Sequence, residues 1–420
     1  MKLASFVRTF CFFAFLALQA RAESFALKNG DRVVFYGDSI TDQRLYTTFT
    51  ETYVVTRFPK LEVSFVHSGW GGDRVTGGGG GPVDLRLRRD VFAYKPTVMT
   101  IMLGMNDGSY RAFDQAIFET YAKGYEHIIN SVEEKLPGIR ITVIEPSPFD
   151  DVTQPTRFEG GYNAVLVRYS QFVKELAERD KLNVADLNAP IVAALEKAKA
   201  IDAELAKKII PDRVHPGPGG HLLMAEALLK SWQAPALVSA VEIDAATKTT
   251  TGAKNTKVSE LKSGNEISWT QLDEALPMPV DLNDPIVALA VKSSDFIQAM
   301  DQQPLKVTGL NAANYTLKID GDEVGSFSGA QLAAGINLAT LPTPMAKQAA
   351  EVHKLTLQHN HIHFQRWRQV QVPLADDNNS KVQAAVKDLI TAMDEEEAEV
   401  VQQQRAAAQP KPHQFQLVPK

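Results

Sequence analysis

The sequence predicts an α/β fold: a three-layer, doubly wound domain with a parallel five-stranded sheet, followed by a small β-rich module and C-terminal helices. Apolar strand-like segments alternate with helical segments from about residue 31 to residue 232, as in a parallel α/β domain. Several of these strands are apolar on both faces, which a sheet covered by helices on each side requires. After Pro235 the composition changes to polar, glycine- and threonine-rich segments, which indicates a second unit.

The elements of the first domain follow one another in a regular order. Five short apolar segments are the predicted strands, at residues 32–37, 62–69, 97–104, 140–146 and 182–187. Segments with helical character lie between them, at residues 44–57, 113–135 and 162–179, and residues 221–232 form the predicted closing helix. This order predicts a sheet in which each strand is connected to the next by a helix.

The second half of the chain contains two hairpin signals and two helical segments. Ser263-Gly264-Asn265 is a turn sequence inside residues 257–272, and Asp320-Gly321 is a turn sequence inside residues 315–327. Residues 343–370 and 379–409 have helical patterns, and we expect the final residues, 410–420, to be loose. The predicted units are a signal peptide (1–22), a first domain (23–236), a β-rich accessory module (237–335) and a C-terminal helical region with a loose tail (336–420).

The first 22 residues have the pattern of a secretory signal peptide. Lys2 and Arg8 precede an apolar run from Phe10 to Leu18, and Ala20-Arg21-Ala22 is a small-x-small cleavage sequence. We expect cleavage after Ala22 and a secreted or periplasmic mature protein. No later segment approaches ~20 continuous apolar residues, so we predict no integral membrane segment after cleavage.

Composition excludes several classes of site. Cys11 lies inside the predicted leader and is the only cysteine, so the mature chain offers no disulfide, cysteine nucleophile or thiolate metal site. Loss of Lys2, Arg8 and Arg21 with the leader changes the formal charge from −6 to −9. An acidic exported protein is a poor candidate for nucleic-acid binding.

Residues suited to chemistry occur where predicted strands end. Ser39, in the stretch VVFYGDSITD, ends the first strand; Gly69, Gly71 and Gly72 follow the second; Asn106, in GMND, follows the third. Asp212 and His215 lie just before the closing helix. These residues would meet at the carboxyl edge of one sheet, where α/β folds place a ligand crevice. The alternative for Ser39 is an ordinary strand-terminating turn.

The four blocks, in this order, resemble those of the SGNH, or GDSL-type, esterase and lipase family over about residues 31–232. The resemblance implies a flavodoxin-like sheet, Ser39 as nucleophile, His215 as its base and Asp212 as the residue that orients the base. It also implies an oxyanion hole formed by the Ser39 and Gly72 backbone N–H groups and the Asn106 side-chain amide.

Two positions depart from a simple match to that family. Asn is frequent in the family at the position where this chain has His67, and Gly71 is the alternative oxyanion donor if the register is shifted by one residue. Asp38 and Asp107 are expected to support the loops that carry Ser39 and Asn106.

The chemistry of ester cleavage requires these residue types. A serine hydroxyl needs a neighbouring base, which histidine supplies near neutral pH. A carboxylate holds the imidazole in one tautomer and stabilises its charged form, and Asp212 and His215 are close enough in sequence for one tight turn. Loss of one oxyanion donor typically costs about 3–4 kcal/mol of barrier.

Other features have competing interpretations. The run Gly77–Gly81 lacks the Gly-Lys-Ser/Thr ending of a phosphate-binding loop, so we favour a flexible lip beside the site. His359 and His363 have a possible metal-ligand spacing, but a solvated or interdomain face is favoured, and no metal is predicted. Trp70, Tyr110 and Arg111 could line the substrate cleft or belong to packing or the surface. Trp269 and Tyr315 could form a sugar-binding face or lie in the core. We expect Asp394–Glu397 to form a solvated helix end.

The sequence therefore favours an exported serine esterase that acts through an acyl-Ser39 intermediate without a cofactor. Its expected substrate is an acetylated glycan, which would make it a carbohydrate O-acetylesterase. One alternative is a lipase, lysophospholipase or aryl esterase of the same family. The other is a non-catalytic glycan-binding or scaffold protein with a vestigial hydrolase domain.

Overall fold

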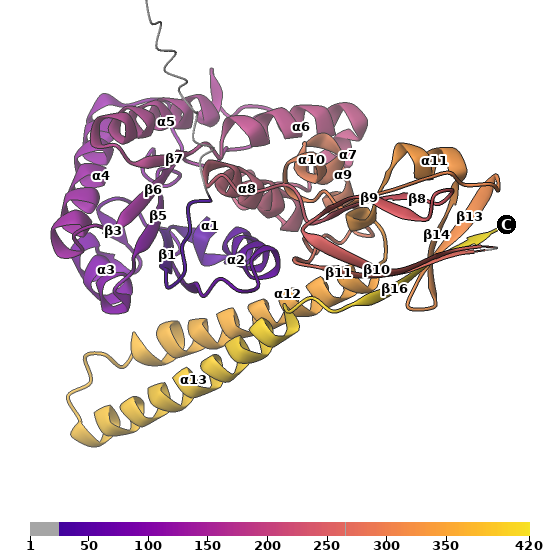
Figure 1. The fold of residues 1–420 in the computed structure, drawn as a ribbon. Helices are drawn as coiled ribbons and strands as arrows, with labels where there is room; N and C mark the ends of the chain where they lie inside the picture. Colours follow the sequence, from indigo (N-terminus) through magenta and orange to yellow (C-terminus); the bar gives the residue numbers. More distant parts are fainter. Residues whose placement is uncertain (1–24, 265) are drawn as a thin grey trace, which may run out of the picture.

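The computed structural model describes residues 25–264 and 266–420, so the predicted signal peptide with Cys11 lies outside the described residues. The chain forms a sheet-centred α/β domain, a β-rich region beside it, and a long helical hairpin that runs beneath the α/β domain (Figure 1). None of the helices that the structure describes has both the length and the apolar character needed to cross a bilayer.

The first domain is built on a five-stranded parallel sheet, which confirms the predicted fold class. The strands are β1 (Arg32–Gly37), β2 (Ser64–Gly69), β5 (Val98–Met102), β6 (Arg140–Ile144) and β7 (Asn183–Ala185), in the spatial order β2-β1-β5-β6-β7. All four pairings are parallel. Every residue of the central strand β5 is buried, which explains why the predicted strands lack alternation of apolar and polar residues.

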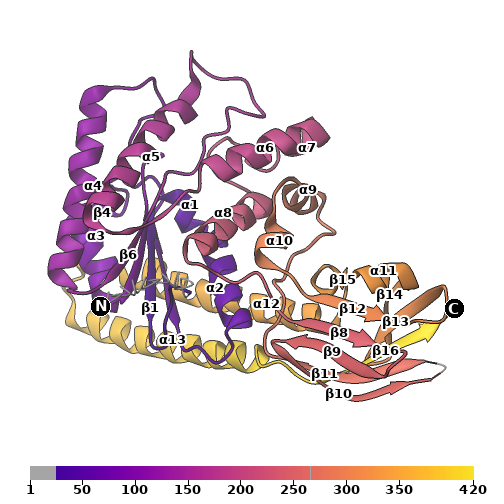
Figure 2. The same cartoon turned by 45° about the horizontal axis from the view of Figure 1, so that its top comes forward.

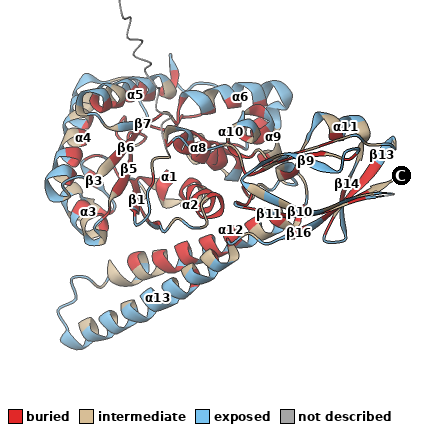
Figure 3. Ribbon diagram, in the orientation of Figure 1, coloured by how far each residue is buried: buried red, intermediate tan, exposed pale blue. Residues whose placement is uncertain are grey.

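Helices cover both faces of this sheet (Figure 2). One face is covered by α2 (Leu45–Arg57) and α8 (Pro218–Ser231), and the other by α4 (Gln115–Lys135) and α5 (Gly161–Asp180). The buried residues gather between these layers (Figure 3). The shorter elements of the domain are α1 (Ser39–Asp42), β3 (Gly77–Gly78), β4 (Gly81–Pro82), α3 (Val83–Asp90), η1 (Phe92–Tyr94), α6 (Ala189–Ile201) and α7 (Ala203–Ala206).

The strand order places a switch point between β1 and β5. The chain moves from β1 outward to β2 and then returns to β5 on the other side of β1. Loops at the carboxyl ends of the two strands that flank such a switch point diverge, and a crevice forms between them. Ser39 follows β1 and Asn106 follows β5, so the topology brings both to this crevice.

The β-rich region consists of two sheets. One has the strand order β10-β11-β16-β13-β14 and the other β15-β12-β8-β9. Their strands are β8 (Ala240–Asp244), β9 (Thr249–Lys254), β10 (Thr256–Ser263), β11 (Ile267–Asp273), β12 (Pro304–Thr308), β13 (Asn314–Ile319), β14 (Asp322–Ser328), β15 (Ile336–Asn337) and β16 (His413–Pro419). The short helix α11 (Gly329–Ala334) connects β14 to β15, and the 3₁₀ turn η2 (Leu338–Thr340) follows β15.

Both predicted hairpins are present in this region. β10 pairs with β11 and β13 pairs with β14, each pair antiparallel. Asp320 and Gly321, with φ of 55° and 89°, form the turn between β13 and β14, and consecutive positive φ values match the twist of a two-residue hairpin loop. Of the other predicted turn, Asn265 lies outside the described residues.

The expected loose tail is wrong. The last residues of the chain form β16, which lies between β11 and β13 in the centre of a sheet. Phe415 and Leu417 are fully buried on one face of this strand. The tail is ordered because each side of its backbone is hydrogen-bonded to a strand that precedes it by about a hundred residues or more.

Two helices within the predicted β-rich module pack on the first domain. α9 (Pro285–Ser293) and α10 (Phe296–Met300) contribute buried residues such as Leu289 and Phe296 to the core of the α/β domain. The α/β core is therefore built from more than the segment before Pro235.

The C-terminal hairpin, defined as residues 344–407, covers the edge of the sheet at β2. It consists of α12 (Pro344–Phe364), a π-helical turn η3 (Gln365–Gln371) and α13 (Ser380–Ala407). Figure 1 shows both helices beneath the α/β domain, and Arg405 of α13 donates to the carbonyl groups of Leu61 (3.1 Å) and Val63. An open sheet edge invites pairing with another chain, and the hairpin covers this one.

Candidate active site

Ser39, His215 and Asp212 lie together at the carboxyl edge of the sheet. Nε2 of His215 lies 2.7 Å from Oγ of Ser39, and Nδ1 of His215 lies 2.7 Å from Oδ2 of Asp212. The other carboxylate oxygen, Oδ1, accepts the backbone N–H groups of Val214 (3.0 Å) and His215 (2.7 Å). Partial burial opposes ionisation of Asp212, but the hydrogen bonds from His215 outweigh it and hold the pKa of Asp212 below its usual range. This arrangement can activate a serine hydroxyl as a nucleophile.

A sharp turn at the end of β1 positions Ser39. Asp38 caps the short helix α1, and its Oδ1 accepts the N–H of Ile40 at 3.0 Å. Gly37 allows the turn to pack closely, because a Cβ there would lie 2.2 Å from Oγ1 of Thr41 and 2.7 Å from the Met102 carbonyl oxygen. Ser39 does follow the end of a strand, and the same turn directs the Ser39 hydroxyl toward His215.

Arg213 connects the turn that carries Asp212 and His215 to a neighbouring loop. Arg213 has φ of 76°, an unfavourable backbone conformation for a side chain of this size. Its carbonyl oxygen accepts the N–H of Asp150 at 2.9 Å, and its guanidinium donates to the Pro155 carbonyl at 2.8 Å. The strain is therefore balanced by contacts with the loop after β6, as is common beside functional sites.

Of the two glycines considered as oxyanion donors, Gly72 has the available N–H. The N–H of Gly71 donates to Oδ2 of Asp42 at 3.1 Å, whereas that of Gly72 has no acceptor among residues 25–264 and 266–420. Gly72 has φ of 77°, in the region that favours glycine, and a Cβ at this position would have open space around it. The geometry therefore favours Gly72 over Gly71.

The amide of Asn106 is held at the same rim by two hydrogen bonds. Its Nδ2 donates to the Asp73 carbonyl at 3.0 Å, and its Oδ1 accepts from the Tyr110 hydroxyl at 2.9 Å. An amide nitrogen carries two hydrogens, so one donor remains after the bond to Asp73. Ser109 and Tyr110 both have positive φ (55° and 54°), a strained backbone that brings the Tyr110 hydroxyl back to the amide.

We expect Asn106→Ala to lower kcat on p-nitrophenyl acetate about 10²- to 10³-fold with little change in KM, because an oxyanion donor acts mainly in the transition state. Tyr110→Phe should have a smaller effect, because it removes only the hydrogen bond that orients the amide. Asn183→Ala, at the opposite end of the sheet, is the control. An unchanged kcat in Asn106→Ala would exclude the amide as a donor.

The two supporting carboxyl groups are fully buried beneath the site. Burial, followed by nearby negative charge for Asp38, raises the pKa of Asp38 to about 7, and burial raises that of Asp107 to about 7. Oδ1 of Asp107 accepts the N–H of Val75 at 3.0 Å, which connects the loop of Asn106 to the loop that follows Gly72.

The glycine run is packed against the oxyanion loop. Gly80 N–H donates to Oδ1 of Asp73 at 3.3 Å, and Arg86 Nε donates to Oδ2 of the same carboxylate at 2.6 Å. A Cβ on Gly78 would lie 2.8 Å from the Gly72 carbonyl oxygen. The run supports the loop that carries Gly72, and glycine is needed because the two backbones approach closely.

Several residues with open assignments belong to the packing. Trp70 is enclosed by the glycine run and by Arg368, whose guanidinium carbon lies 3.2 Å from the ring centroid. Trp269 and Tyr315 are buried in the core of the β-rich region, which removes the sugar-binding alternative for them. Arg111 is exposed.

The histidines of the C-terminal hairpin form part of an interdomain contact. Nε2 of His359 lies 2.6 Å from Oε1 of Glu51 on α2, and His359 and His363 both face Glu397. Asp394, Glu395 and Glu396 of the acidic cluster are exposed, as predicted, whereas Glu397 is partly buried against these histidines. Within the part of the chain that the structure describes, His, Cys, Asp and Glu side chains form no group of three or more suited to a metal ion.

Comparison with known proteins agrees with this geometry. Residues 35–223 match the GDSL-like lipase/acylhydrolase family. The chain therefore contains a domain that matches this family. An acetylxylan esterase from Geobacillus stearothermophilus is 27% identical in an alignment of 225 residues, and the alignment covers 48% of this chain and 94% of that esterase. A solved structure of a gut microbial diltiazem-metabolizing enzyme is 28% identical and covers 95% of this chain and 99% of its own, with a TM-score of 0.79.

This acylhydrolase is therefore a carboxylic ester hydrolase. Sequence reasoning missed three residues near its site: Asp42, Arg213 and Arg368. Asp42 could have been found from its place three residues after Ser39, on the same short helix. Arg368 had no such signal, because it comes from a helix about 300 residues away in sequence.

Proposed function

We propose that this acylhydrolase is an exported O-acetylesterase of glycans, with Ser39, His215 and Asp212 as its catalytic residues. The observation that carries the proposal is the open position of Asp212 and His215: 56% of the Asp212 side chain and 36% of the His215 side chain are exposed. An acetyl group on a polymer can approach such an open site from solvent without the polymer entering a tunnel. The acetylxylan esterase that resembles the first domain supports the same class of substrate.

In the proposed mechanism, Nε2 of His215 takes the proton of Ser39 Oγ as the oxygen attacks the ester carbonyl carbon. The tetrahedral oxyanion accepts hydrogen bonds from the N–H groups of Ser39 and Gly72 and from Asn106 Nδ2. Collapse breaks the bond to the alcohol oxygen, which receives the proton from His215. Water, activated by the same imidazole, then attacks the acyl-Ser39 ester and releases the carboxylic acid. Asp212 stabilises the imidazolium in both steps.

A second candidate is an esterase for acetates of small aromatic alcohols. The structural relative that covers 95% of this chain is named as a gut microbial diltiazem-metabolizing enzyme. Both candidates share a small acyl group and differ in the alcohol, so the acyl preference and the alcohol preference have to be measured separately.

The acyl preference is tested with p-nitrophenyl esters of increasing chain length. We expect kcat/KM to be highest for acetate and to fall beyond about four carbons, because one extra methylene in a small pocket changes binding by roughly 1–3 kcal/mol. Rates that rise with chain length would instead indicate a lipase-like site and would contradict the proposal.

The alcohol preference is tested by acetate release from acetylated xylan, pectin and chitin-type glycans beside diltiazem. Release from a glycan at a higher kcat/KM than from diltiazem supports the glycan esterase, and the reverse order supports the second candidate. Ser39→Ala is the blank for spontaneous hydrolysis.

The export and the division of the chain are part of the same proposal. Residues 1–22 act as a cleaved leader. Residues 23–236, with α9 and α10 packed on them, form the hydrolase domain, and residues 237–335, completed by β15 and β16, form the β-rich module. Residues 344–407 form the C-terminal hairpin. The amino-terminal sequence of the protein recovered outside the cytoplasm, beginning at Glu23, would support the leader.

A further inference from the structure

The C-terminal hairpin reaches the loop that carries the oxyanion donor. After α12, the π-helical turn η3 places Arg368 against the end of β2, where residues 69–73 begin the loop. Nη1 of Arg368 donates to the Gly69 carbonyl at 3.3 Å, and Nη2 of Arg368 lies 3.5 Å from Oδ2 of Asp42. The guanidinium carbon of Arg368 also lies 3.2 Å from the centroid of the Trp70 ring, and Trp70 lies between Gly69 and Gly71 in the chain.

Asp42 connects Arg368 to the site. The same carboxylate oxygen that faces Arg368 accepts the N–H of Gly71 at 3.1 Å, and Gly72 is the next residue. Asp42 also lies on α1, the helix that begins at Ser39. One carboxylate therefore connects the helix of the nucleophile to the loop of the oxyanion donor, and Arg368 is the cation beside it.

The charge of Asp42 would oppose catalysis if it were alone. A carboxylate one residue from the Gly72 N–H repels the negative charge that develops on the substrate oxygen in the transition state. Asp42 and Arg368 are both largely shielded from water, with 21% and 19% of their side chains exposed, so solvent screens this repulsion only in part. A paired guanidinium removes most of the repulsion and fixes the carboxylate on Gly71.

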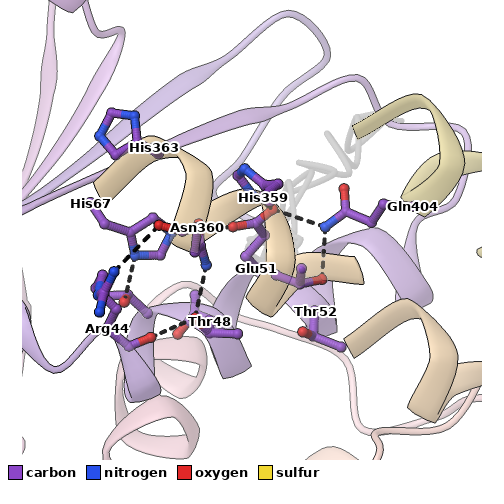
Figure 4. Close-up of polar contacts among 12 residues, drawn as sticks. Arg44, Thr48, Glu51, Thr52, His67, His359, Asn360, His363 and Gln404 are labelled. Carbon is purple, nitrogen blue, oxygen red and sulfur yellow. Dashed lines mark hydrogen bonds and ion pairs between the residues drawn. The ribbon is translucent and has the colours of Figure 1, made fainter. Parts of the chain in front are cut away.

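The hairpin is held firmly enough to present Arg368. Nε1 of Trp367 donates to Oδ1 of the buried Asp90 at 2.7 Å. On α12, which precedes this turn, Asn360 Nδ2 donates to Oγ1 of Thr48 at 2.8 Å, and His359 is hydrogen-bonded to Glu51 (Figure 4). These contacts anchor α12 and η3 to α2 and to the end of α3, and π-helical turns are frequent at functional sites.

We propose that Arg368 is a positioning residue of the esterase, and that the C-terminal hairpin completes the oxyanion hole by fixing and neutralising Asp42. The inference rests on the proposed role of Gly72 and Ser39 and gives the hairpin a part in catalysis. Arg368 acts through Asp42 and the 69–73 loop, without contact with the reacting atoms.

The test compares the full-length protein with Arg368→Ala on p-nitrophenyl acetate. We expect kcat to fall about tenfold or more with KM changed less than twofold, because the effect is confined to the transition state. Arg368→Lys, which keeps the charge, should recover much of the rate. Arg366→Ala is the matched control, because Arg366 lies on the same turn and pairs with Asp394 and Gln371 of the hairpin itself.

A second substitution separates charge neutralisation from simple packing. Asp42→Asn in the Arg368→Ala background removes the uncompensated charge and keeps an acceptor for Gly71, so the double variant should be faster than Arg368→Ala. Added salt should also raise the rate of Arg368→Ala more than that of the wild type.

Three results would overturn the inference: a kcat of Arg368→Ala within twofold of the wild type, an equal loss in Arg366→Ala, or a double variant slower than the single one. The synthetic ester keeps this test independent of the glycan proposal. A wild-type protein that cleaves p-nitrophenyl acetate and leaves acetylated glycans intact would refute the proposed substrate alone.

Discussion

Ser39→Ala should lower kcat/KM on p-nitrophenyl acetate by about 10⁴-fold or more, the largest effect expected from any single substitution in this protein. The hydroxyl oxygen lies 2.7 Å from Nε2 of His215, so its removal leaves the imidazole without a nucleophile to deprotonate. Asp38 still caps α1 in the variant, and the thermal unfolding midpoint should therefore stay close to that of the wild type.

Non-additivity provides the sharper form of this prediction. His215→Ala should cause a loss similar to that of Ser39→Ala, and the double variant should be no slower. The two residues act as a unit, so removal of either one already abolishes their joint contribution to the rate. The residual rate of all three should reflect the oxyanion donors and binding alone. Activity of Ser39→Ala within tenfold of the wild type, with the fold intact, would exclude Ser39 as the nucleophile.

The first sheet could be predicted because both of its faces are buried. Strands such as β1 and β5 have continuous apolar sequences, and the carboxyl ends of parallel strands share one edge of the sheet. Ser39 and Asn106 follow two neighbouring strands, so their convergence follows from topology alone. The sequence spacing of Asp212 and His215 likewise required only one turn, which the structure contains.

The contacts made by the C-terminal part could not be predicted in the same way. β16 alternates buried Phe415 and Leu417 with less buried glutamines, a strand pattern, but its partners β11 and β13 lie far away in the sequence. Arg368 has an ordinary sequence context, and its place beside Asp42 depends on how the hairpin docks. Such contacts are set by tertiary packing, which leaves no local pattern in the chain.

Glu51 should be the residue on which docking of the hairpin depends most strongly. This fully buried carboxylate on α2 faces Nε2 of His67 (3.2 Å) and Nε2 of His359 (2.6 Å), and accepts from Nε2 of Gln404 at 2.9 Å (Figure 4). Its partners come from β2, α12 and α13. Removal of one partner of a buried ion pair leaves an uncompensated charge, so Glu51→Ala should lower the free energy of unfolding by about 3–5 kcal/mol.

Denaturant unfolding of full-length protein measures this loss, and hydrogen exchange of the amides in residues 344–407 locates it. Glu351→Ala is the matched control, because Glu351 lies on α12 with an exposed side chain that pairs with the exposed Lys354. Such a surface pair contributes at most about 1 kcal/mol. A loss in Glu51→Ala no larger than that in Glu351→Ala would show that the hairpin does not depend on Glu51.

The contribution of this pair should depend on pH in a defined direction. Burial favours the neutral imidazole, but the carboxylates of Glu51 and Glu397 outweigh it and raise the pKa of His359 from 6.5 to about 10. Burial likewise opposes ionisation of Glu51, yet His359 and His67 bring its pKa well below 4.5. The raised pKa of His359 stabilises the folded state below about pH 6.5, and this contribution is lost as the pH rises to about 10. The lowered pKa of Glu51 stabilises the folded state above about pH 4.5, and this contribution is lost as the pH falls below that value. The pair is therefore most stabilising between about pH 4.5 and 6.5.

The stability difference between wild type and Glu51→Ala should thus be largest in that window and shrink as the pH rises toward 10. Because the hairpin carries Arg368, weaker docking should also reduce the rate. Glu51→Ala should then lower kcat on p-nitrophenyl acetate already at pH 6, whereas the wild type should lose the contribution of Arg368 only at higher pH. A Glu51→Ala variant that is less stable but retains full kcat would show that docking and catalysis are independent, because Arg368 would then hold Asp42 without this anchor.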